Sequence, residues 1–150
     1  MRHFLVVFKE FPIDRTAVRS GQVSQEVVTA CRCVNIGLFV SGDLRRDVTV
    51  SIAIGQADDM RVISFPGAKL RRVSPDERSI SFFLLKAVEK MGSITSGDYF
   101  EMDNGIGLTR VSLDEFIRSS EQVLIQVPSF NPERFILDAN LSSDRSKNTT

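Results

Sequence analysis

The stretch CRCVNIGLFVSGDLRRD, residues 31–47, decides how the chain around it is organised. Its first half is mostly apolar and continues a helical pattern, and its second half is a polar turn. The next residues, 48–54 (VTVSIAI), form an apolar run typical of a buried strand. Arg45, Arg46 and Asp47 therefore lie where a helix leads into a sheet. These charges either face water or build a polar site, because burying them without partners is costly.

The length and composition predict a single domain. At 150 residues the chain is long enough to bury a core without cross-links, and we expect one domain over residues 1–139. Residues 140–150 are almost entirely polar and predict a disordered tail. No apolar run approaches the roughly 18 residues that cross a bilayer, and charges follow the first apolar run at once, unlike in a signal peptide. We expect a cytoplasmic protein with no membrane partner.

The two cysteines and the single histidine argue against a metal site. Cys31 and Cys33 are two positions apart in a predicted helix, so their side chains point to different sides and do not clamp one ion. His3 is the only histidine, which argues against a histidine-based triad. We therefore expect small buried thiols and no metal.

Positive charge is concentrated in the first part of the chain, although the net charge is zero. Residues 1–90 carry 14 basic and 10 acidic residues, whereas residues 91–150 carry 5 and 9. A general nucleic-acid coat would be more basic overall. The basic residues of the middle third form either one binding face or a solvated surface. They are Arg45, Arg46, Lys69, Arg71, Arg72 and Arg78.

Hydrophobic periodicity in the first part of the chain predicts a strand, a loop and a helix. The apolar run 4–8 predicts the strand, and residues 9–21 the loop. Ser24 is the expected N-cap of a helix that runs to about residue 40, with Gly42 as a stop. The core stripe of this helix comprises Val27, Val28, Cys31, Val34 and Leu38, and Arg32 and Asn35 share a neighbouring face.

The middle of the chain predicts a hairpin and then a second helix. After a turn at 55–59, residues 61–65 and 69–73 are expected to pair about Pro66-Gly67. Ser74 is the predicted N-cap of the helix, and Ser74-Pro-Asp-Glu77 reads as a capping box. Its expected core positions are Ile80, Phe83, Leu84, Ala87, Val88 and Met91.

Weaker signals in the last third complete an α/β pattern. They predict a strand at 98–102, a turn at 103–107, a helix opened by Ser112 or Asp114, and strands at 122–127 and 135–137. Alternating strands and helices favour a three-layer α/β sandwich with a mostly parallel sheet. Ligands of such sheets gather at the carboxyl ends of the strands.

Several motifs together resemble one family, the archaeal-type tRNA (pseudouridine(54)-N(1))-methyltransferases of the SPOUT superfamily. The matching residues are 31–35 (CRCVN), 38–39 (LF), Ser41, 44–47 (LRRD) and 74–79 (SPDERS). The spacing between these blocks fits the family as well. The resemblance covers residues 1–91 well and 92–127 loosely.

The resemblance implies an S-adenosylmethionine-dependent transfer of a methyl group to N1 of pseudouridine in the T-arm of tRNA, by a homodimer. It implies an RNA-binding side formed by Arg32, Asn35, Arg45, Arg46, Asp76, Glu77 and Arg78. Arginines of this kind pair with phosphates, and Asp47 is the expected catalytic acceptor of the N1 proton. The cofactor-binding residues are unknown.

The sequence departs from the family pattern in two places. Glu26 and Val28 stand where the family usually has an arginine and an aspartate before the double-cysteine motif. Residues 128–150 contain no Gly-Asp-His-Ile-Gly-type loop and no closing helix, which in the family form the knot that holds the methyl donor. We therefore expect the SPOUT-like fold here with its C-terminal trefoil knot incomplete or absent.

Three functions remain open from the sequence. The first is a tRNA methyltransferase, and the second is a non-catalytic RNA-binding or dimerisation remnant that keeps the substrate half. The third is an unrelated α/β domain whose arginines are merely solvated. Donor binding separates the first two, and binding to a T-arm hairpin separates the second from the third.

Overall fold

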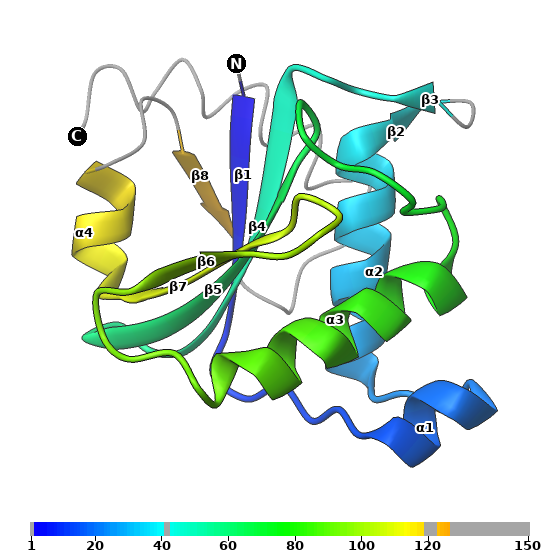
Figure 1. Ribbon diagram of the computed structural model, residues 1–150, viewed down its shortest axis with the longest axis horizontal. Helices are drawn as coiled ribbons and strands as arrows, with labels where there is room; N and C mark the ends of the chain where they lie inside the picture. The colour runs from blue at the N-terminus through cyan, green and yellow to red at the C-terminus, as the bar shows by residue number, and fades with distance from the viewer. Residues whose placement is uncertain (1, 41–42, 119–122, 127–150) are drawn as a thin grey trace.

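A sheet of six strands forms the middle layer of the part of the chain that the computed structural model describes, residues 2–40, 43–118 and 123–126 (Figure 1). Its order is β6-β7-β5-β4-β1-β8. The strands are β1 (Arg2–Phe8), β4 (Val48–Gln56), β5 (Asp59–Pro66), β6 (Tyr99–Glu101), β7 (Gly107–Val111) and β8 (Val123–Gln126).

The sheet has a parallel half and an antiparallel half. Strand β1 lies between β4 and β8 and is parallel to both, with Phe4 opposite Val50 on one side and Leu124 on the other. Strands β5, β7 and β6 follow in antiparallel pairs. The α/β class is thus confirmed. The expected parallel arrangement holds for β4, β1 and β8, while the remaining described strands are antiparallel.

Helices cover both faces of the sheet and produce three layers (Figure 1). Helices α2 (Gln25–Leu38) and α3 (Glu77–Met91) lie on one face, and α1 (Arg15–Ser20) packs against α3. The short helix α4 (Leu113–Arg118) lies on the other face. Its Phe116 closes a smaller core with Leu5, Ala53, Met60 and Val62.

Helix α2 begins and packs largely as the sequence predicts. The Oγ of Ser24 accepts a hydrogen bond from the Val27 amide at 3.3 Å, which is an N-cap. Four of the five predicted stripe residues are buried, and Val28 is half-buried. The helix ends at Leu38 and the chain becomes extended in β2 (Phe39–Val40), which pairs with β3 (Asp43–Leu44). Gly42, the expected stop, lies outside the described residues.

The predicted loop over residues 9–21 is wrong, because it contains helix α1. Asp14 caps this helix by accepting a hydrogen bond from the Ala17 amide at 2.8 Å. Gly21 ends it in the left-handed conformation, with φ of 75°, which glycine adopts without strain. Both signals are in the sequence, but only six residues lie between them.

The predicted hairpin about Pro66-Gly67 is also wrong. The residues expected to form its first arm belong to β5, which pairs with β4 across the tight turn at Ala57 and Asp58. Residues 69–73, expected as the second arm, form no strand. Instead the Lys69 and Leu70 amides both donate to the Pro66 carbonyl at 3.0 Å, so the chain turns tightly after β5.

Helix α3 begins two residues later than the capping box predicts. Asp76, not Ser74, is the N-cap, and its Oδ1 accepts from the Ser79 amide at 2.7 Å. The Ser74 amide instead donates a hydrogen bond to the Ser79 hydroxyl oxygen at 3.1 Å. Ser79 therefore makes two hydrogen bonds to the polar turn before the helix, one through its amide and one through its hydroxyl. These local bonds hold the turn.

The described residues after position 97 agree with the sequence predictions except at one strand. The strands expected at 98–102 and 122–127 correspond to β6 and β8, and Ser112 precedes α4 and accepts from the Glu115 amide at 3.1 Å. Strand β7 was not predicted, because Thr109 and Arg110 break its apolar pattern. The strand expected at 135–137 and the tail at 140–150 lie outside the described residues.

Among the helices of the described part, none is long and apolar enough to cross a membrane.

Candidate functional site

The corner formed by Arg45, Arg46 and Asp47 is tied to its surroundings mainly through backbone groups. The Arg45 amide donates to the Leu38 carbonyl at 2.6 Å, and the Asp47 carbonyl accepts from the Arg2 amide at 3.0 Å. Arg46 and Asp47 are exposed, and Arg45 is half-buried. The corner is therefore fixed in position while the side chains of Arg46 and Asp47 reach solvent.

One guanidinium nitrogen of Arg46 donates hydrogen bonds to two backbone carbonyls. Its Nη1 donates to the Gly67 carbonyl at 2.9 Å and to the Leu70 carbonyl at 3.2 Å. These bonds connect the corner to the turn that leads into helix α3. Arg46 thus orders the chain between β5 and α3, a role that the sequence did not indicate.

The other predicted binding residues lie on α2 and at the start of α3. Arg32 is exposed on α2, and Asn35 is half-buried one turn later, where its carbonyl accepts the amide of the C-cap Phe39. Asp76 and Glu77 are exposed, and the Glu77 carbonyl lies 3.8 Å from the Cys31 thiol, which donates to it. The first turn of α3 therefore contacts the middle of α2.

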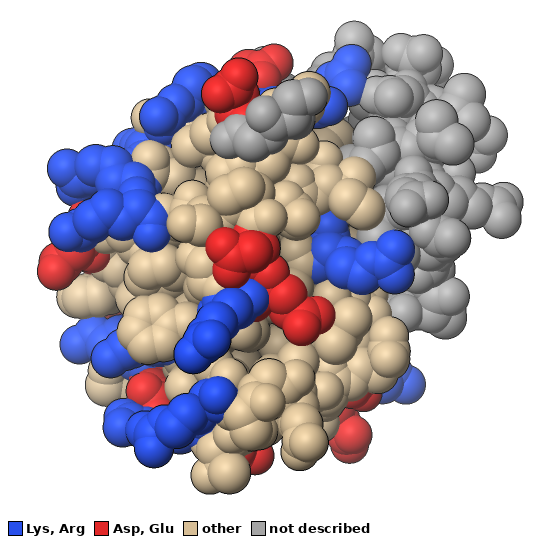
Figure 2. Space-filling view, turned by 90° about the vertical axis from the view of Figure 1, so that its right-hand side faces the viewer, with Lys and Arg blue, Asp and Glu red and all other residues tan. Residues whose placement is uncertain are grey.

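Arg78 faces helix α1. It lines a hollow of about 590 Å³ between α1 and α3, together with Arg15, Arg19 and Asp76. A smaller hollow of about 140 Å³ is also lined by Arg19 and Arg78. Figure 2 shows the side of the molecule formed by these helices, where groups of Lys and Arg alternate with acidic and uncharged surface.

A shared site for the corner and the start of α3 stays a prediction. The bonds of Arg46 link the corner to residues 67–70, and the following residues run directly into α3. The hollows beside Asp76 and Arg78 are lined by α1 and α3, and neither includes the corner.

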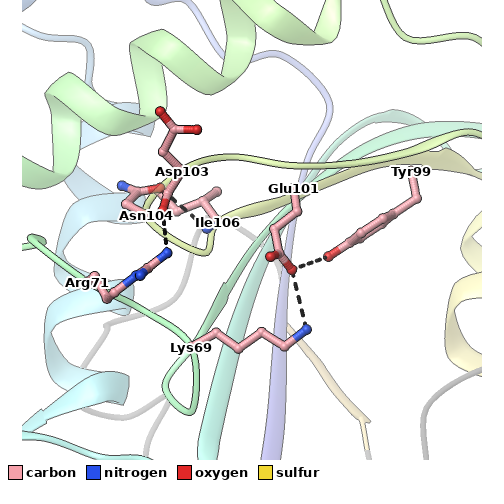
Figure 3. Close-up of polar contacts among 7 residues, drawn as sticks. All are labelled: Lys69, Arg71, Tyr99, Glu101, Asp103, Asn104 and Ile106. Carbon is pink, nitrogen blue, oxygen red and sulfur yellow. Dashed lines mark hydrogen bonds and ion pairs between the residues drawn. The ribbon is translucent and has the colours of Figure 1, made fainter.

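A second cluster, missed from the sequence, joins the segment after β5 to the turn between β6 and β7 (Figure 3). Lys69 forms an ion pair with Glu101 at 3.3 Å. The Arg71 guanidinium donates to the Asp103 carbonyl at 2.8 Å, and the Arg71 amide donates to the Asn104 carbonyl at 2.9 Å. Lys69 and Arg71, two of the basic residues expected to form one binding face, therefore contact the β6–β7 turn. The cluster fixes the β6–β7 turn against residues 69–71.

The same turn carries an unpaired buried amide. Asn104 is 4% exposed, and its Nδ2 has no hydrogen-bond partner among the described residues. Leaving such a donor unpaired costs about 1–3 kcal/mol. Its Oδ1 is used, because it accepts from the Ile106 amide at 3.4 Å. Asn104 lies in the wall of a hollow of about 490 Å³ between α3 and the β6–β7 turn.

The buried titratable groups do not form a catalytic constellation. Burial raises the pKa of Cys31 and of Cys33 to about 12, so both thiols are neutral near pH 7 and are poor nucleophiles. The described residues contain no group of three or more His, Cys, Asp or Glu that could hold a metal ion.

The hollow at the carboxyl ends of the parallel strands does not fit a methyl donor such as S-adenosylmethionine. A hollow of about 520 Å³ lies at the carboxyl ends of β1 and β4, the usual place for a ligand in such a sheet. A cofactor pocket needs a few polar groups held in place within apolar walls. The charged residues of this hollow, Lys9, Asp58, Asp59 and Arg61, are all exposed.

Sequence comparisons identify relatives for most of the described part. Residues 1–126 match a family described as "Putative SAM-dependent RNA methyltransferase". The tRNA (pseudouridine(54)-N(1))-methyltransferase of Methanococcus maripaludis is 41% identical over 106 residues, which are 61% of this chain and 54% of the relative. The enzyme of the same name from Haloferax volcanii is 32% identical over 120 residues, 76% of this chain and 57% of the relative. The chain thus spans about half the length of these curated relatives.

Proposed function

Because this chain belongs to the family of SAM-dependent RNA methyltransferases, we propose that it acts in the methylation of tRNA at N1 of a pseudouridine in the T-arm. The match over residues 1–126 carries this proposal, together with relatives that bear the name of that activity. Within the activity, we assign to this chain the binding and positioning of the RNA.

The exposed side chains support a role in RNA binding. Arg46 and Asp47 reach solvent from a corner whose backbone is fixed, and Arg32 reaches solvent from the neighbouring helix. Arginine binds phosphate with two parallel hydrogen bonds, and a fixed backbone limits the entropy lost on binding. Because the net charge is zero, attraction to RNA must come from such local groups.

Asp47 is the proposed acceptor of the N1 proton. Methylation at N1 replaces its hydrogen, so a base within hydrogen-bond reach of that nitrogen is required. Asp47 combines an exposed carboxylate with a backbone carbonyl held by Arg2. S-adenosylmethionine supplies an electrophilic methyl group in this chemistry. A homodimer, with tRNA as its substrate, belongs to the same proposal.

A second candidate is RNA binding without methyl transfer. One observation favours it, since the hollow at the carboxyl ends of β1 and β4 is lined by exposed charged residues and does not fit a donor. Titration calorimetry of the 150-residue chain with S-adenosylmethionine addresses this alternative. Micromolar binding supports the methyltransferase, and no binding at millimolar donor supports the second candidate.

The test of the proposed function uses two T-arm hairpins that differ only at the target, one with pseudouridine and one with uridine. Transfer of radioactive methyl groups from S-adenosylmethionine to the pseudouridine hairpin alone is the expected result. Binding of that hairpin without transfer would leave only the second candidate. A chain that binds neither hairpin would contradict both, and the arginines would then be solvated surface groups.

A further inference from the structure

An exposed aromatic and basic surface lies outside the residues proposed above. It surrounds the hollow of about 490 Å³ between α3 and the β6–β7 turn. We define this aromatic–basic face by Arg72, Phe82, Lys86, Lys90 and Phe100, with Asn104 in its wall. Phe82 is 44% exposed and Phe100 is 39% exposed, although large apolar side chains are normally covered.

The helix and the strand present these side chains together for simple geometric reasons. Phe82, Lys86 and Lys90 are each four residues apart in α3, so they form one stripe along the helix. Phe100 comes from β6, and its neighbour Tyr99 points to the opposite face of that strand. The Lys86 ammonium lies 5.4 Å from the Phe82 ring centroid, and the Lys90 ammonium lies 4.5 Å from that of Phe100.

The charges of this face favour an anionic partner. Arg72, Lys86 and Lys90 line the hollow, and Asp103 is the acidic residue in its lining. A second copy of the chain docked by a two-fold axis would place lysines of the two copies against each other. A polyanion instead gains from each cation, and counterions are released when it binds.

Exposed rings beside flexible cations are typical of surfaces that bind single-stranded nucleic acid. Such surfaces stack bases on aromatic side chains and hold phosphates with basic residues. A duplex offers its phosphates but keeps its ring faces stacked inside. Between these two forms of RNA, the two phenylalanines therefore favour unpaired bases.

We propose that the aromatic–basic face binds unpaired nucleotides of the RNA substrate, with bases on Phe82 and Phe100 and phosphates on Lys86, Lys90 and Arg72. The proposal rests on the proposed function, which makes RNA the substrate. An exposed cation–π contact is weaker than base stacking, so a base displaces the lysine from the ring and the lysine moves to a phosphate. An acceptor in the hollow also offers the unpaired Nδ2 of Asn104 a partner.

The face is continuous with the start of α3. Phe82 and Lys86 also line the hollow of about 590 Å³ that contains Asp76 and Arg78. An RNA segment that crosses Phe82 therefore reaches Arg78, which the family resemblance predicts to bind RNA. A loop of several unpaired nucleotides follows this path, whereas a blunt duplex gains only charge contacts.

The experiment measures fluorescence anisotropy of the full chain with three probes: a T-arm hairpin, a blunt duplex with the sequence of its stem, and a single-stranded oligouridylate. The variants are Phe82→Ala, Phe100→Ala and Lys86→Ala. Tyr99→Ala is the matched control, because Tyr99 is an exposed aromatic residue, 64% accessible, on the other side of β6. Thermal unfolding of each variant identifies any loss of fold.

We expect Phe82→Ala and Phe100→Ala each to weaken binding of the hairpin and of oligouridylate about fivefold or more, which is the low end for one stacked base. Neither variant changes binding of the duplex. Lys86→Ala weakens all probes and lowers the salt slope by roughly 0.7 to 0.9. Tyr99→Ala binds every probe like the wild type.

Two results overturn the proposal. One is equal behaviour of Phe82→Ala and Tyr99→Ala with every probe at unchanged stability. The other is a loss of self-association in Phe82→Ala, seen by size-exclusion chromatography, with RNA affinity unchanged, which assigns the face to a second copy. A wild type that binds oligouridylate through Phe82 but not the T-arm hairpin contradicts the proposed function and keeps this inference. A wild type that binds no probe contradicts both.

Discussion

At the scale of single residues, Arg45 and Arg46 differ in what their removal should change. Arg46 bonds two carbonyls of the turn before α3, so Arg46→Ala is expected to disturb that turn as well as any RNA contact. Arg45→Ala is the cleaner probe, because the hydrogen bond to the Leu38 carbonyl comes from its backbone. Arg46 thus shows how a predicted binding residue can also have a structural role.

We predict that Arg45→Ala weakens binding to a T-arm hairpin and lowers the salt slope by about one unit per lost phosphate contact. Arg118→Ala is the matched control, since Arg118 is exposed on α4, across the sheet, and pairs with Asp114 one turn away at 2.9 Å. Binding isotherms at several salt concentrations provide the measurement. Equal slopes for both variants would identify Arg45 as a solvated residue.

His3 is predicted to make the stability depend on pH. Burial lowers its pKa from 6.5 to about 4, and its Nε2 lies 2.7 Å from the Ser51 hydroxyl. The unfolded chain therefore binds a proton below pH 6.5 that the folded protein accepts only near pH 4. Stability is fully present above pH 6.5, and about 2 kcal/mol of it is lost by pH 5.

Urea unfolding at pH 7 and pH 5 measures this loss. The control is His3→Gln, which keeps a polar side chain but has no group that titrates in this range. The variant should lose much less stability than the wild type between the two pH values. Parallel pH curves for the two proteins would show that His3 is not responsible.

At the scale of elements, the turn after β5 determines where the candidate corner lies. A Cβ on Gly67 would lie 1.9 Å from the Arg45 carbonyl oxygen and 2.7 Å from that of Val48, and both are backbone atoms. The Gly67 amide also donates to the Val48 carbonyl at 2.8 Å. Only glycine permits this close approach of two chain segments.

We predict that Gly67→Ala lowers the free energy of unfolding by more than about 2 kcal/mol, since rigid backbone must move to admit the methyl group. Gly92→Ala is the control, because its added Cβ would meet the Glu89 oxygen at an ordinary 3.5 Å and its φ is −61°. Urea midpoints of the two variants test the difference. Similar midpoints would mean that the turn adjusts without cost.

The elements also show what the sequence could and could not specify. Long periodic segments such as α2, and strands with apolar runs such as β1 and β4, were predictable because their burial pattern is local. Pro66-Gly67 was misread as a hairpin turn, because the reason for its glycine is contact with residues 45–48, far away in the sequence. The Phe82 and Phe100 side chains were missed for the same reason: only the fold brings them to one hollow.

At the scale of the whole molecule, Phe116 is the main link between the sheet and its second helical layer. It packs against the smaller core, and its ring meets the His3 ring edge-on with centroids 5.3 Å apart. The two cores are on opposite faces of the sheet, and the core beneath α4 is the smaller one. Helix α4 therefore contributes to stability through few residues. Removing one of them should therefore affect the whole layer.

We predict that Phe116→Ala costs about 3 kcal/mol of stability and raises the pKa of His3 toward 6.5, because the imidazole gains water. As His3 is the only histidine, its NMR titration is free of overlap. Tyr99→Ala, at an exposed aromatic residue, should change neither quantity. An unchanged His3 titration in Phe116→Ala would mean that other neighbours keep it dry.

The position of β1 has a consequence for how the protein is made. This strand leaves the ribosome before β4 and β8, yet it pairs with both, and His3 lies opposite Val123 in the finished sheet. At ordinary rates of synthesis, of 5–20 residues per second, roughly 6 to 24 s pass before the residues of β8 exist. During that time one edge of an apolar strand stays open on the nascent chain. Chaperones that hold unpaired strands should therefore bind this protein during translation and release it once β8 has docked.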